Sequence, residues 1–251
     1  MTLTYFDHLL VFVLAAWVPI QGALFYRRLM RAVMSGVPGA RMRAYRRTLI
    51  WEWSLVGVLL VGWFAAGRSP GELGLGLSMG WGGWGALVGI AVTIAACTFL
   101  VRQTAMVEED EAVQEQLRET MQHLRPLVPA NRREMRRFVA LSITAGICEE
   151  LLYRGFLLWY TSQITVLPVA VLTSAFIFGA GHVYQGGKGI VRTAIFGLVA
   201  TGLYLLTESL WAPMVLHAVL DVTSGNLLRK VLNPRDPDQP LDDPLDDPHR
   251  N

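Results

Sequence analysis

The sequence predicts an all-α fold, a polytopic membrane bundle of about seven transmembrane spans in seven or eight helices. Its mean hydropathy is +0.38 and only 17% of its 251 residues are charged, which leaves too little polar surface for a soluble globular protein of this length. Apolar stretches also recur along the chain, each close to the roughly 20 residues that a helix needs to cross about 30 Å of hydrocarbon. The predicted spans are 5–26, 49–66, 80–100, 138–160, 164–181, 190–207 and 210–228.

The positions of the basic residues predict an N-terminus outside the cell and a cytoplasmic C-terminus. Basic residues near helix ends are retained on the cytoplasmic side of the membrane. Arginines cluster between the first two spans and before the fourth, whereas Arg68 is the only basic residue between the second and third spans. A cleaved signal peptide is the alternative for the first span, but no basic residue precedes its apolar run and many arginines follow it.

Residues 1–228 are expected to form the transmembrane bundle, and two segments are expected to lie outside the bilayer: a cytoplasmic loop within the bundle sequence and a C-terminal tail. The cytoplasmic segment of about 102–137 carries Val113, Leu117, Met121 and Leu124 at helical spacing, which predicts a helix on the membrane interface or against the bundle. The tail 229–251 is rich in Pro and Asp and has too few large apolar side chains to fold alone, so we expect it to be disordered and cytoplasmic.

Cysteine and charge content exclude several classes of function. Cys97 and Cys148 both lie inside predicted spans, so neither a disulfide framework nor a cysteine metal cluster is indicated. The net charge is only +2, and contact with anionic lipid explains the basic loops without a nucleic-acid partner.

Charged side chains inside the fourth span mark a candidate site. Burying each one in a membrane helix costs about 2.5–3.5 kcal/mol, so such residues usually face a protein interior or a water-filled cavity. Glu150 and Arg154 are spaced i,i+4 and can form an ion pair. Glu149, about 100° around the helix, then lacks a cation of its own and could act as a general base. The alternative is a buried ion-pair network that only fixes the helix register.

Two histidines in later spans extend the candidate site. Phe178 and His182 are four residues apart at the end of the fifth span, and His217 and Asp221 are four apart in the seventh. A buried histidine oriented by a carboxylate can stabilise a developing oxyanion. Taken singly, an interfacial histidine or an isolated His–Asp pair explains each observation. Together, the buried charges of three spans imply a shared cavity.

Two further acids lie in or beside predicted spans. Glu52 and Glu208 are both close to span ends, where exposure at the membrane interface is expected to explain them.

Three sequence motifs resemble the CAAX protease and bacteriocin-processing (CPBP or Abi) family of glutamate-dependent intramembrane proteases. They are Glu-Glu-x-x-x-Arg at 149–154, Phe-x-x-x-His at 178–182 and His-x-x-x-Asp at 217–221, and they occur in this order on separate spans. The resemblance covers about 138–228, whereas the first three spans match only as generic membrane helices.

The resemblance implies an intramembrane endopeptidase that hydrolyses a peptide bond of a membrane-associated protein or peptide. Glu149 would activate water, His182 would hold or activate it alongside, and His217 would stabilise the oxyanion. The last motif position is Asn or Asp in the family, and a carboxylate there cannot donate to an oxyanion. We therefore assign Asp221 to orienting His217 or to a metal. The supporting residues would be Glu150, Arg154 and Phe178.

No cofactor is expected, and zinc is the alternative. Two histidines with carboxylates could ligate zinc, in which case Glu149, His182, His217 and Asp221 would be the ligands. The chain lacks the His-Glu-x-x-His helix of common zinc proteases, which favours metal-independent water activation.

The expected partners are the lipid bilayer and the substrate, in a multi-pass protein of the plasma (inner) membrane of a prokaryote. Two other functions stay open. One is a catalytically silent membrane scaffold or immunity factor, and the other is a proton-coupled transporter. The two halves of the chain show no inverted repeat of the kind many transporters have.

Overall fold

The computed structural model describes residues 2–76 and 84–233, and all of its secondary structure in these ranges is helical. The bounds are α1 (Tyr5–Phe12), η1 (Val13–Trp17), α2 (Val18–Met34), α3 (Ala40–Ala65), α4 (Trp84–Glu109), α5 (Glu111–Met121), η3 (Gln122–Leu124), α6 (Arg132–Glu150), η4 (Leu151–Leu157), α7 (Leu158–Ile164), α8 (Leu167–Gly181), η5 (Val183–Gln185), α9 (Gly186–Thr207) and α10 (Trp211–Leu232). Helices α1 and α2 are joined into one continuous helix by the π-helical segment η1, and α6 and α7 are joined in the same way by η4. The prediction of an all-α bundle is therefore confirmed.

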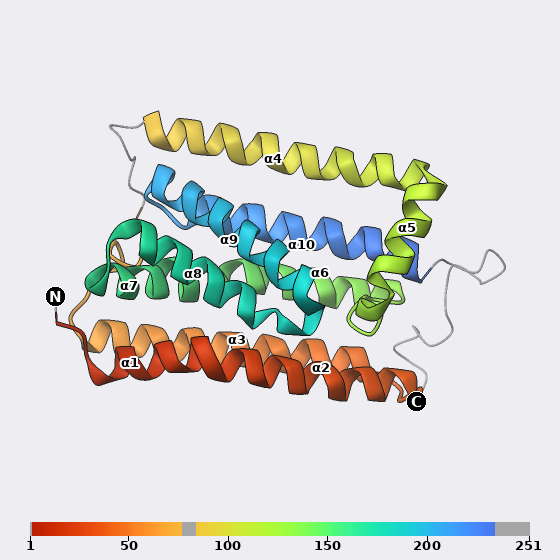
Figure 1. Cartoon of the computed structure of the whole chain (residues 1–251), viewed down its shortest axis with the longest axis horizontal. Coiled ribbons are helices and arrows are strands. Elements are labelled where there is room, and N and C mark those ends of the chain that lie inside the picture. The colour runs from red at the N-terminus through yellow and green to blue at the C-terminus, as the bar shows by residue number, and fades with distance from the viewer. Residues whose placement is uncertain (1, 77–83, 234–251) are drawn as a thin grey trace, which may run out of the picture.

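The helices form a layered bundle. Figure 1 shows α1, α2 and α3 along one side, α4 along the opposite side, and α6 to α10 between them. Helix α3 packs against α6, and α4 packs against α9 and α10. The three family-like motifs thus lie on the inner helices α6, α8 and α10 and on the segments that directly continue α6 and α8.

Each of the seven predicted spans coincides with a helix, although residues 80–83 of the third lie outside the described residues. By length and composition, four helices could cross a membrane: Tyr5–Met34, Ala40–Ala65, Trp84–Glu109 and Val183–Thr207. Helix α8 is apolar but only 15 residues long. The other two helices contain the charged residues of the candidate site. The count of seven spans and the orientation of the N-terminus stay predictions.

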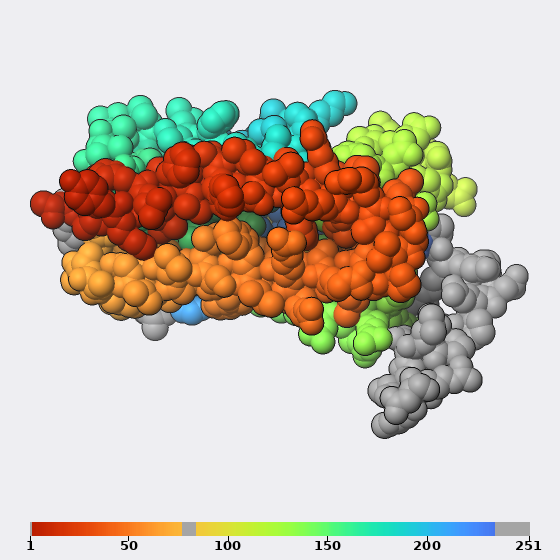
Figure 2. Space-filling model, turned by 90° about the horizontal axis from the view of Figure 1, so that it is seen from below, coloured from red at the N-terminus to blue at the C-terminus, as the bar shows by residue number. Residues whose placement is uncertain are grey.

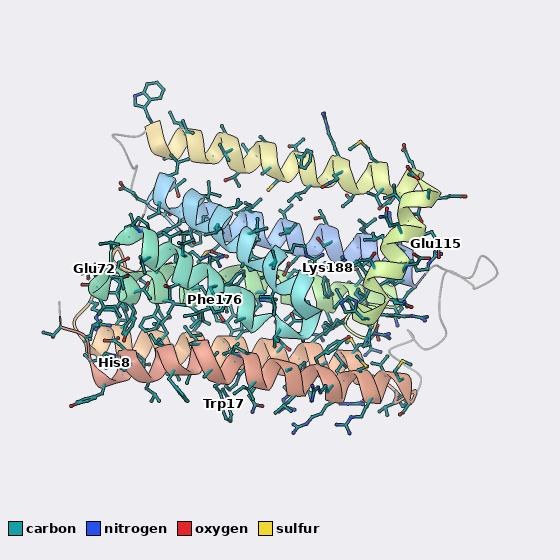
Figure 3. The ribbon with its side chains drawn as sticks, viewed as in Figure 1. His8, Trp17, Glu72, Glu115, Phe176 and Lys188 are labelled. Atoms are coloured by element: carbon teal, nitrogen blue, oxygen red, sulfur yellow. The ribbon has the colours of Figure 1, made fainter. Side chains whose placement is uncertain are left out.

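Hydrophobic side chains point outward over much of the surface. Trp17 lies on the outer face of the first helix in Figure 3, and Trp84, Ile94 and Phe176 are also exposed. Several charged side chains are buried instead, among them Asp7 and Arg68. This inverted distribution is expected of a protein whose surroundings are lipid.

The segments predicted outside the bilayer are partly helical. Helix α4 continues to Glu109 and α6 begins at Arg132, so helices extend into both ends of the segment 102–137. Within it, α5 packs against α10, and Leu117 and Met121 contact a cluster that includes Val231. The apolar face therefore rests on the bundle, one of the two predicted alternatives.

Helix α10 also extends further than predicted. It ends at Leu232, so the first four residues of the predicted tail 229–251 are helical. Its side chain contacts explain the extension, because Val231 and Leu232 are buried against Val128 and the α5 face. The remainder of the predicted tail, from 234, lies outside the described residues.

Candidate active site

Glu150 and Arg154 form the buried centre of the site. Arg154 Nη1 donates a hydrogen bond to Glu150 Oε1 at 3.0 Å. Glu150 is 0% exposed and Arg154 is 1% exposed. The guanidinium carbon lies 4.1 Å from the centroid of the Phe178 ring, which gives the cation an aromatic face as well as a carboxylate. The i,i+4 pair is thus present as predicted, although the π-helical segment η4 begins between its members.

Glu150 also binds His217 on α10. His217 Nδ1 donates to Glu150 Oε1 at 2.9 Å, and because an ionised carboxylate can only accept, this contact places the ring proton on Nδ1. One carboxylate oxygen therefore ties α6 to α10. Gly146 permits the close approach, because a Cβ there would lie 2.8 Å from the Met214 carbonyl oxygen.

The second ring nitrogen of His217, Nε2, faces the carboxylates of Glu149 and Asp221. Nε2 lies 3.8 Å from Glu149 Oε2 and 3.8 Å from Asp221 Oδ2. The side chains of Glu149 and Asp221 are 19% and 39% exposed, whereas that of His217 is 5% exposed. The catalytic candidates therefore form the open side of the cluster.

The structure differs from the prediction in what orients His217. We expected Asp221 in this role, but 3.8 Å is too long for a hydrogen bond. Glu150 fixes the ring instead, and Asp221 is left to face the open side.

His182 directly follows the last residue of α8 and lies next to the Phe178 ring. Its Nδ1 donates to the Phe178 carbonyl oxygen at 3.0 Å, which leaves Nε2 available for water or substrate. The Phe178 ring centroid lies 5.0 Å from that of His182 and 6.0 Å from that of His217. His182 also interacts electrostatically with Asp221. All the residues singled out in the three motifs are thus brought together.

Glu52 on α3 is a member of this cluster that the sequence analysis placed wrongly. It is 8% exposed rather than interfacial, and its carboxylate interacts electrostatically with those of Glu149 and Asp221. The predicted span began at 49, which put Glu52 near its end. The helix begins at Ala40, so Glu52 lies in its middle. Glu208, by contrast, is exposed after α9, as predicted.

The described part of the chain shows no preformed metal centre. Within residues 2–76 and 84–233, no group of three or more His, Cys, Asp or Glu side chains is arranged to hold a metal ion. Glu149, His182, His217 and Asp221 therefore do not fit zinc in this arrangement. Whether the chemistry is metal-independent stays a prediction.

The inner helices can be reached from one face of the molecule. Figure 2 shows a narrow hollow between α2 and α3, with atoms of deeper helices visible through it. Toward the end of α3, Phe6 of α1 packs against Gly62, and toward its start Phe25 of α2 packs against a cluster containing Ala44. Glu52 lies on α3 between these two contacts.

Comparison with known proteins agrees with the resemblance seen in the motifs. Residues 132–223 match the family described as Type II CAAX prenyl endopeptidase Rce1-like. No curated protein and no solved structure matches the chain. The matched residues contain α6, η4, α7, α8, α9 and the part of α10 that carries His217 and Asp221. The segment that holds the candidate active site is therefore similar to the CAAX prenyl endopeptidase family, in agreement with the three motifs.

Proposed function

We propose that the protein is an intramembrane endopeptidase that hydrolyses a peptide bond in a membrane-associated protein or peptide, with Glu149 as the general base. The observation that carries the proposal is the unequal environment of the two adjacent glutamates. Glu150 is buried and its Oε1 accepts hydrogen bonds from Arg154 and His217, whereas the Glu149 side chain is 19% exposed and accepts a hydrogen bond from neither. Two carboxylates in such different environments suit different roles.

Glu149 is placed to take a proton from water. Its side chain is 19% exposed, so a water molecule at the open side of the cluster can reach the carboxylate, and proton transfer to the carboxylate leaves a nucleophilic oxygen. His182 Nε2 is available to hold that water or the substrate. The contribution of such a base is about 10²–10⁴-fold in rate.

His217 is placed to stabilise the oxyanion of the tetrahedral intermediate. Its Nδ1 is held by Glu150, so the ring cannot turn away, and Nε2 faces the carboxylates where the reaction would occur. When protonated, Nε2 can donate a hydrogen bond to the developing negative charge. Arg154 and Glu150 then act as positioning residues, and the Phe178 ring lies next to both histidines.

Cleavage assays on the purified chain test the proposal. The substrates are a farnesylated peptide ending in a CAAX sequence, the same peptide without the lipid, and a leader-bearing membrane peptide. We expect the wild type to cleave at least one, and Glu149→Gln to be at least about 100-fold slower because it removes the base. Glu119→Gln, an exposed acid on α5, is the control and should cleave at the wild-type rate.

The outcomes separate the competing functions. Cleavage at the wild-type rate by Glu149→Gln would remove Glu149 as the base. A folded wild type that cleaves none of the substrates would favour the scaffold, or the transporter if uptake into proteoliposomes depends on Glu149. Glu149→Gln also serves as a substrate trap, since peptides that remain bound can be identified by mass spectrometry.

A further inference from the structure

Glu52 differs from the buried acids that serve the fold. Asp7 receives two hydrogen bonds from Arg68, at 2.7 and 2.6 Å, and also caps its own helix through Thr4. Glu134 accepts a hydrogen bond from the backbone N–H of Ala130 at 2.8 Å. Glu52 Oε2 is enclosed and has no hydrogen-bond partner among the described residues, a property that it shares with one oxygen each of the site acids Glu149 and Glu150. A buried carboxyl oxygen without a donor is costly, so a structural role does not explain it.

The surroundings of Glu52 carry an excess of acids. Its carboxylate interacts with those of Glu149 and Asp221, and the neutral groups Cys148, Tyr153 and Tyr184 also lie within electrostatic range of this cluster. Arg154 donates a hydrogen bond to Glu150 and to none of these three acids. The nearest cationic donor to Glu149 and Asp221 is His217 Nε2, and at 3.8 Å it makes a hydrogen bond to neither.

Such a cluster favours a ligand that brings positive charge and N–H donors. Like charges in a poorly solvated site repel, and a charge-assisted hydrogen bond to an ammonium group relieves this repulsion. Peptide hydrolysis generates that group. The water oxygen bonds to the carbonyl carbon, the C–N bond breaks, and the leaving nitrogen takes the proton that Glu149 removed from water. The new carboxyl group then loses a proton and the amine gains one, which gives a carboxylate and an ammonium.

We propose that Glu52 and Asp221 form a subsite for the leaving amine, which binds the new N-terminus of the released fragment beside Glu149. The subsite rests on the proposed peptidase function and assigns it a polarity: the fragment on the C-terminal side of the cleaved bond lies toward α3. Glu52 supplies the enclosed acceptor, and Asp221, which is more exposed, supplies the acceptor nearer the opening.

Product binding to the full-length protein tests the subsite. The probes are the tripeptide valyl-isoleucyl-methionine, which has a free N-terminal amine, and its N-acetyl form, both titrated calorimetrically. We expect the free amine to bind the wild type about tenfold more tightly than the acetylated peptide, the size expected for one charge-assisted hydrogen bond. Glu52→Gln should abolish this preference, Glu52→Asp should keep part of it, and Glu119→Gln should leave it unchanged.

Two outcomes would overturn the subsite: equal binding of the two peptides to the wild type, or a preference that survives in a folded Glu52→Gln variant. Thermal unfolding of each variant shows whether it is folded, and Glu52→Asp provides a second variant if Glu52→Gln is not. Because binding is measured without turnover, the result is separate from the peptidase test. A Glu52-dependent amine preference without cleavage would leave an amine-binding site but remove its assignment to a leaving group, whereas cleavage without the preference would remove the subsite alone.

Discussion

Glu150 accepts hydrogen bonds from Arg154 on the continuation of its own helix and from His217 on α10. Glu150→Leu leaves Arg154 as a buried charge without its carboxylate, and we expect a loss of about 3–5 kcal/mol in the free energy of unfolding. The double variant Glu150→Leu with Arg154→Met removes both charges and should be more stable than Glu150→Leu alone. Denaturant unfolding in detergent measures both.

The two variants should nevertheless be equally impaired in cleavage, because His217 Nδ1 loses its acceptor in each. Glu115→Leu, which removes an exposed partner of Arg118 on α5, is the control and should change stability little. If the double variant is the less stable one, Arg154 has another essential partner and the pair is not the centre of the site.

Residue-level contacts along one helix could be predicted, and contacts between helices could not. The Glu150–Arg154 pair follows from i,i+4 spacing alone. The Glu150–His217 hydrogen bond joins residues 67 apart, and it depends on how closely α6 and α10 approach. Glu52 was placed wrongly for a related reason, because the arginine-rich start of α3 hides where the helix begins.

At the scale of helices, the crossing of α6 and α10 depends on the absence of a side chain at Gly146. A Cβ there would lie 2.8 Å from the Met214 carbonyl oxygen and 3.0 Å from the Ala218 nitrogen, on either side of His217. Gly146→Ala should therefore push α10 away from Glu149, with lower thermal stability and slower cleavage. Gly202→Ala on α9 is the matched control, because a Cβ there meets no atom within 4 Å.

The control should be neutral or more stable, since Ala is favoured over Gly in a helix by about 1 kcal/mol. The prediction is tested by melting temperature and cleavage rate on the same preparations. Equal behaviour of the two variants would show that the α6–α10 distance does not determine the site.

Helix positions could be predicted from hydropathy, but some helix ends could not. The fifth span was expected at 164–181, whereas α8 begins at Leu167 with Pro168 in its first turn, where proline favours a helix start. The result is a helix of 15 residues, about 22 Å long, which is shorter than a full span. Its end at Gly181 coincides with the predicted end of the span, so His182 directly follows the helix as the sequence indicated.

At the scale of the whole molecule, the basic residues gather at one end of the bundle. The end of α2, the starts of α3 and α6, helix α5 and the end of α10 lie together in Figure 1, opposite the N-terminus. These segments contain most of the arginines, including Arg43 and Arg133, whereas the loop after α3 contains only Arg68, which is buried against Asp7. The folded bundle therefore has its basic residues concentrated at one end, in agreement with their uneven distribution among the loops of the sequence.

This asymmetry predicts which loops face the cytoplasm. Basic residues are retained on that side, so the loop between α2 and α3 should be cytoplasmic and the loop after α3 should be outside. Ser35→Cys and Gly71→Cys, both at exposed positions, place one thiol in each loop, while Cys148 is buried and Cys97 lies within α4. With a membrane-impermeant maleimide, Gly71→Cys should react in intact cells and Ser35→Cys only after permeabilisation. The reverse pattern would place the N-terminus inside, and the substrate segment would then have to reach Glu149 from the opposite side of the membrane.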